Sequence, residues 1–280
     1  MHLNEADKQK LASALSEAKK KYGPAALERL EEAFAIAMGL KQPVAPEDPA
    51  QVGTGFFFPG LVAKPWHDNK EDFPICAKLE QSWEAIRDEL KYALDNRRGF
   101  QQYLLKGAGQ KKDSNYSAPE EWKALYLKEH TEEFAENRAM CPETVRIIED
   151  EPRVSNYVYF SALNPGGHAG PYYATYNSTF NIQMGLIVPD NCGVRVKDET
   201  RRWEEGKCLI FDASFAHEAW NSADSTLFIL VITTFHPELT DIEVSLLKQV
   251  NIALASQADA AHATALKEGR KQLEGKKWWA

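Results

Sequence analysis

The feature that most constrains this chain is the stretch 203–220, WEEGKCLIFDASFAHEAW, together with the apolar run 226–235 that follows it. The pattern predicts a β-strand, a tight turn, a second strand that exposes His217, and a third strand over 226–235. A histidine that a rigid strand carries into the mouth of a small barrel is well placed to bind a metal ion. The stretch therefore predicts a β-barrel with His217 at its open end.

The segments around this region show other periodicities. From 157 to 235, short apolar and aromatic runs alternate with turn residues, which is typical of barrel strands. Residues 5–39 carry apolar positions at helical spacing, interrupted near Gly23, and predict a pair of helices. Residues 72–96 predict one amphipathic helix that covers a barrel face. After residue 240, helical periodicity returns over 241–273.

Three regions follow from these patterns. We expect an N-terminal helical extension over 1–40, a barrel domain with covering helices over 55–240, and a C-terminal helix and tail over 241–280. The proline-rich residues 41–54 between the first two regions are typical of a linker. The terminal helices offer packing surfaces, so a homodimer through them is possible.

Composition excludes several classes of protein. The formal charge of −8 over 280 residues, with no basic stripe, argues against nucleic-acid and anionic-membrane partners. The four cysteines lack a CxxC spacing and are read as reduced thiols. The N-terminus has no apolar core of signal length, and no run of about 18 apolar residues occurs elsewhere. We expect a soluble, cytoplasmic protein.

Five short motifs occur in a fixed order: GLIVP at 185–189, WEEGK at 203–207, FDASF at 211–215, His217-Glu218, and HPELT at 236–240. Together they resemble the aspartyl/asparaginyl β-hydroxylase family of iron(II)- and 2-oxoglutarate-dependent oxygenases. The resemblance extends from about Phe56 to Thr240. It implies a mainly β fold, a double-stranded β-helix (cupin-like jelly-roll) barrel with helical N- and C-terminal extensions.

The resemblance implies that two histidines bind the iron, without the carboxylate that most such oxygenases use. His217 matches the second ligand in its flanking residues. The first ligand is open: a local His-x-Gly-Pro makes His168 the candidate, but an ungapped count between Pro165 and Gly185 places Tyr172 at that position. Tyr172 is therefore a candidate catalytic residue that could bind a substrate, ligate a metal or simply form a pocket wall.

A formal His-x-Glu pattern at His130 and Glu132 is a further candidate metal site. It lies within 122–137, which reads as a helix. Residues two apart on a helix point to roughly opposite faces and cannot hold one ion. We therefore do not expect a metal there.

The co-substrate site departs from the family pattern. Ser161 matches a serine of the family's 2-oxoglutarate pocket, but Asn181 and Gln183 stand where the family has an arginine and a histidine. Both amides can still point into the barrel, because residues two apart on a strand share a face. Leu227 stands where an arginine would hold the distal carboxylate of 2-oxoglutarate. A buried carboxylate facing Leu227 would be costly without a cation from elsewhere.

The first functional hypothesis is an iron(II) oxygenase, using 2-oxoglutarate, that hydroxylates an amino-acid-like, peptidyl or carrier-tethered small substrate. The second is a barrel enzyme that no longer uses 2-oxoglutarate and performs another metal-dependent oxidation, a cyclisation or an isomerisation. The third is a barrel that only binds a ligand. The fold alone does not choose among them, because one barrel can host many chemistries.

Overall fold

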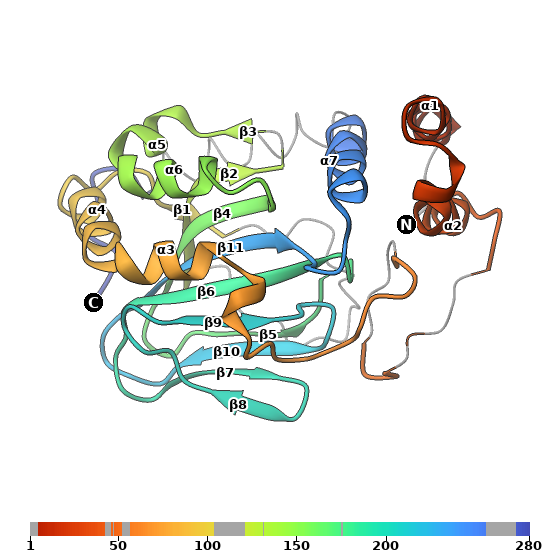
Figure 1. The fold of residues 1–280 in the computed structure, drawn as a ribbon. Helices are drawn as coiled ribbons and strands as arrows, with labels where there is room; N and C mark the ends of the chain where they lie inside the picture. Colours follow the sequence, from red (N-terminus) through yellow and green to blue (C-terminus); the bar gives the residue numbers. More distant parts are fainter. Residues whose placement is uncertain are drawn as a thin grey trace.

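A computed structural model describes residues 5–42, 46, 48–51, 57–103, 121–130, 132–174, 176–255 and 273–280. Two antiparallel sheets face each other and enclose the barrel interior (Figure 1). The larger sheet has the order β1 (Gln101–Gln102), β2 (Trp122–Glu129), β4 (Val154–Leu163), β11 (Leu227–Phe235), β6 (Thr179–Ile187) and β9 (Cys208–Phe211), with β3 (Glu132–Glu133) paired to β2. The smaller sheet has the order β5 (His168–Tyr172), β10 (His217–Asn221), β7 (Cys192–Val196) and β8 (Glu199–Arg201). The mainly β barrel with flanking helices is confirmed.

Helices cover the outer face of the larger sheet. They are α3 (Ile75–Gln81), α4 (Trp83–Asp95), α5 (Ala135–Met140) and α6 (Pro142–Glu149). The short 3₁₀ helix η2 (Lys70–Asp72) precedes α3. The central strand β11 separates two cores by simple alternation of its side chains. Leu227, Ile229 and Val231 pack inside the barrel, whereas Phe228, Leu230 and Ile232 pack outward against the helices. The barrel interior is therefore lined by alternate residues of each strand.

The terminal helices form a third layer at one end of the barrel. They are α1 (Glu5–Tyr22), η1 (Pro24–Leu27), α2 (Glu28–Ala37) and α7 (Asp241–Ala255). Leu30 and Phe34 pack with Val244 and Leu247 in one buried cluster. The expected helical pair, interrupted near Gly23, is confirmed. The expected helix over 241–273 is described only to Ala255, and dimerisation through these helices stays a prediction.

One helix prediction was wrong, and a second was right except that the helix is divided in two. Residues 122–129 form strand β2, not a helix. Both faces of this strand are buried, so apolar and polar residues do not alternate along it and the sequence lacks the usual strand pattern. His130 follows β2, and its Nε2 lies 2.8 Å from the Tyr157 hydroxyl. The single helix over 72–96 is interrupted at Ser82, whose hydroxyl donates to Glu143 (2.8 Å).

Candidate active site

His217 is buried on the inner face of β10 and is held as a neutral imidazole. Its Nδ1 lies 2.9 Å from the carbonyl oxygen of Phe215. Because a carbonyl can only accept, Nδ1 carries the proton and Nε2 keeps a free lone pair. Burial lowers the pKa of His217 to about 4. Nε2 is buried and has no hydrogen-bond partner within the described part of the chain.

Tyr172, not His168, lies beside His217. In the β5–β10 ladder Tyr172 is opposite His217, and the two rings are 4.3 Å apart. His168 is opposite Trp220 on the outer face of the same sheet. There it is about half exposed, and its Nε2 lies 2.9 Å from the Glu218 carboxylate. The structure does not bring His168 and His217 together, so the expected two-histidine metal site is absent from this arrangement.

A β-bulge at Gly170 explains why sequence counting left this choice open. Ala169 pairs with Ala219 and Tyr172 pairs with His217, so β5 holds one more residue than β10 between these pairs. The bulge turns Tyr172 to the face opposite His168, although the two residues are four apart. Gly170 has φ +113°, and a Cβ there would lie 2.7 Å from the His217 carbonyl oxygen. This position therefore requires glycine.

The turn that delivers His217 is fixed by a buried carboxylate that sequence reasoning missed. Asp212 accepts hydrogen bonds from the backbone N–H (2.8 Å) and hydroxyl (2.6 Å) of Ser214. It also accepts from the Gln51 side-chain amide (3.0 Å). Burial raises the pKa of Asp212 to about 7. The Asp-Ala-Ser sequence is a recognisable side-chain-to-backbone turn, whereas no sequence signal links Gln51 to it.

The residues expected to bind a co-substrate do face the barrel interior, but tryptophans engage two of them. The Trp122 indole donates to the Ser161 hydroxyl (2.8 Å), and the Trp203 indole donates to the Gln183 side-chain oxygen (3.1 Å). Asn181 lies on the same face of β6 as Gln183 and is partly buried. Leu227 is buried in the inner cluster.

Aromatic side chains nearly fill the interior. Tyr103 stacks on Trp122 with ring centres 3.7 Å apart, and the Tyr159 ring lies 5.5 Å from that of Tyr103. The remaining cavity has a volume of about 30 Å³, close to the share of one water molecule in the liquid. None of the described residues that line it is charged.

Comparison with known proteins identifies the scaffold. Residues 80–237 match the model of the aspartyl/asparaginyl β-hydroxylase family. This chain belongs to that family. The family of enzymes expected from the five motifs is thus confirmed, over a narrower range than 56–240.

Curated relatives of this β-hydroxylase family member are moderately similar. The aspartyl/asparaginyl β-hydroxylase of Homo sapiens is 32% identical over 191 residues, 65% of this chain and 24% of the relative. The ornithine lipid ester-linked acyl 2-hydroxylase of Rhizobium tropici is 31% identical over 59% of this chain and 58% of its own length. The aspartate β-hydroxylase domain-containing protein 2 of Xenopus tropicalis is 28% identical over 67% and 51%. This chain therefore spans between about a quarter and three-fifths of these relatives.

No described helix of this family member is both long and apolar enough to cross a membrane. Two of these relatives, those of Homo sapiens and Rhizobium tropici, are hydroxylases by name. Whether the interior of this chain can hold the expected iron and 2-oxoglutarate depends on the residues present.

The residues present in the barrel interior fit neither iron(II) nor 2-oxoglutarate. A facial iron site needs about three protein or co-substrate donors around one open position. Among the described residues, no group of three or more histidine, cysteine, aspartate or glutamate side chains is arranged to hold a metal ion, and the two-histidine site that the resemblance implies would need His168 and His217 on one face of the sheet. His168 lies on the far face of the sheet, leaving His217 beside the phenol of Tyr172.

The 2-oxoglutarate site is equally changed. Its distal carboxylate would face Leu227 in an interior to which none of the described lining residues brings a cation. The nearby arginines point elsewhere: Arg195 is bonded to Glu218, Arg201 to Asp68 and Arg202 to Asp190. A carboxylate desolvated in such a place costs several kcal/mol. The expected iron(II) and 2-oxoglutarate therefore disagree with the site that the structure builds.

Proposed function

We propose that this β-hydroxylase family member catalyses proton transfer, an isomerisation, on a small uncharged group, without iron or 2-oxoglutarate. The observation that carries the proposal is the free, buried Nε2 of His217, which faces the barrel beside the phenol of Tyr172. A fixed neutral imidazole is the commonest general base in enzymes. Burial raises the pKa of Tyr172, so its hydroxyl keeps its proton and can donate a hydrogen bond.

His217 would act as the general base, and Tyr172 would act as the hydrogen-bond donor. Nε2 of His217 takes a proton from a carbon next to a carbonyl, and the C–H electron pair moves into the new enolate double bond. The Tyr172 hydroxyl donates to the carbonyl oxygen while it carries the negative charge. In a β,γ-unsaturated acyl group the enolate is a dienolate that extends over the neighbouring carbon–carbon double bond. Nε2 then returns the proton to the γ carbon, the double bond moves next to the carbonyl, and the product is an isomer formed without an oxidant.

The interior selects the chemical class of substrate. Uncharged lining residues favour a neutral reacting group, and a cavity of about 30 Å³ favours a very short one. Entry of even a short acyl group must displace at least one aromatic ring. A thioester acyl group tethered to a carrier meets these conditions, because its bulky part remains outside the barrel.

Solvent deuterium exchange tests this proposal directly. The probe is S-acetyl-N-acetylcysteamine, a small neutral thioester, incubated in D₂O with the full chain and followed by mass spectrometry. General-base catalysis predicts exchange at the acetyl carbon about 100-fold faster than with His217→Gln. The matched control His168→Gln, on the outer face, should exchange as fast as the natural chain, and added iron(II) with 2-oxoglutarate should change nothing.

A barrel that binds a neutral ligand without catalysis is the second candidate, and the uncharged side chains among its described lining residues favour a neutral ligand. It predicts no exchange above the His217→Gln background, while the probe still changes the fluorescence of Trp122 and Trp203. That result would overturn the proton-transfer proposal. Exchange that persists in His217→Gln would overturn it as well.

A further inference from the structure

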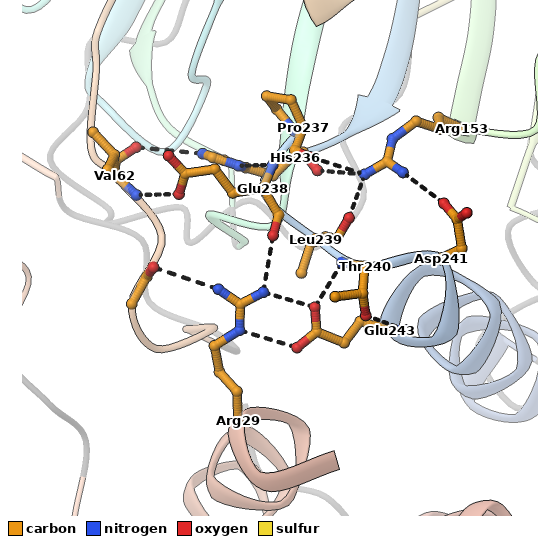
Figure 2. Close-up of polar contacts among 11 residues, drawn as sticks. Arg29, Val62, Arg153, His236, Pro237, Glu238, Leu239, Thr240, Asp241 and Glu243 are labelled. Carbon is orange, nitrogen blue, oxygen red and sulfur yellow. Dashed lines mark hydrogen bonds and ion pairs between the residues drawn. The ribbon is translucent and has the colours of Figure 1, made fainter. Parts of the chain in front are cut away.

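A second cavity lies outside the barrel and is about ten times larger than the first. Its volume is about 320 Å³, at the lower end of the range for metabolite sites. It lies between the segment that precedes α3 and the turn that follows β11. Figure 2 shows the side formed by Val62, His236 and Glu238.

Charged groups of both signs face this cavity. The Lys64 side chain is exposed, and no ion pair of it is found in the described ranges. Asp72 uses one carboxylate oxygen to accept from His67 Nε2 (2.7 Å). Glu238 uses one oxygen to accept from the Val62 N–H (3.0 Å). One cation and two carboxylates therefore line this cavity, and each carboxylate has a second oxygen that can accept a hydrogen bond.

Aromatic rings form another part of the lining. The ring of Phe180 lies 5.6 Å from that of His67 and 5.0 Å from that of His236. His236 Nδ1 accepts from the Glu238 N–H (3.1 Å), so its proton is on Nε2, which lies 3.3 Å from the Val62 carbonyl oxygen. Burial lowers the pKa of His236, which keeps it neutral. Charged groups of both signs and aromatic rings thus line the same cavity.

We propose that this cavity binds a small amphoteric molecule, with an amine and a carboxylate joined by a short apolar chain. The carboxylate would pair with Lys64, the ammonium would pair with the open oxygens of Asp72 and Glu238, and the chain would lie along Phe180. Because these groups are partly exposed, the affinity is modest and falls with ionic strength. The site is separate from the barrel and does not depend on the reaction proposed there.

Calorimetric titration with a length series tests the site. The probes are 4-aminobutanoate, 5-aminopentanoate and 6-aminohexanoate, with pentanoate and pentylamine as single-charge controls. At low salt, at least one amino acid should bind about tenfold more tightly than either control. Lys64→Gln and Asp72→Asn should each weaken that binding about tenfold, equivalent to about 1.4 kcal/mol.

Two control variants test whether the loss of amino-acid binding is specific to this cavity. Lys91→Gln changes an exposed lysine on α4 and should leave the binding unchanged. His217→Gln changes the barrel interior and should also leave it unchanged, so failure of the barrel proposal and failure of this one are distinguishable. Equal affinity for the amino acids and the single-charge probes, or binding that survives Lys64→Gln, would overturn the proposal.

Discussion

Tyr172→His should give the barrel a metal affinity that the natural chain lacks. The new imidazole would stand opposite His217, where the present ring centre is 4.3 Å from the histidine ring. His217 already has the tautomer of a metal ligand, with Nδ1–H bonded to a carbonyl and Nε2 free. Two imidazoles on one inner face would then share an ion, with water completing its coordination.

Cobalt(II) absorption is the readout, because its visible bands report coordination directly. We expect Kd to move from beyond the millimolar range to the micromolar range, about 4 kcal/mol. Tyr173→His, one residue along, is the matched control and should show no gain. Adding His217→Ala to Tyr172→His should abolish the bands. Cobalt binding by the natural chain that depends on His168 would contradict this arrangement of the site.

Arg29→Ala should release the N-terminal helices from the barrel. Figure 2 shows the Arg29 guanidinium bonded to both Glu243 carboxylate oxygens, at 3.0 and 2.7 Å, and to the Glu238 carbonyl oxygen at 2.9 Å. Burial alone would raise the pKa of Glu243, but the bonds from Arg29 and Thr240 outweigh it and the net pKa is lowered. Glu243 is therefore an ionised, buried group that depends on Arg29.

Removing one partner of such a pair leaves an uncompensated buried charge, at a cost of about 3–5 kcal/mol. Urea unfolding should show this loss, and limited proteolysis should cut within residues 5–37 of Arg29→Ala first. The double variant Arg29→Met/Glu243→Leu removes both charges and should recover most of the stability. A loss below about 1 kcal/mol in Arg29→Ala would mean that the pair behaves as an ordinary surface ion pair.

The sequence predicts those features that follow from the alternation of side chains along a single β-strand. The strand that carries His217 and the shared face of Asn181 and Gln183 follow from patterns within single strands, whereas the inward position of Leu227 follows from the family resemblance. The motif order also predicts the family and the barrel. These features depend on neighbours along the chain, so the residues alone are sufficient to find them.

What the sequence does not predict depends on contacts between distant segments. The bulge at Gly170 changes the face of Tyr172 and is visible only in its pairing with β10. The burial of β2 on both faces removes the alternation that marks a strand. The bond of Gln51 to Asp212 joins residues 161 positions apart. The second cavity likewise forms where the 62–72 segment meets the end of β11.

Anaerobic titration of the natural chain with iron(II) and then 2-oxoglutarate tests most directly whether the aromatic interior stands in place of the iron and 2-oxoglutarate site that the family resemblance implies. We predict no visible charge-transfer band and no heat of 2-oxoglutarate binding at millimolar concentrations. A band that forms with 2-oxoglutarate and disappears in His217→Ala would contradict the account.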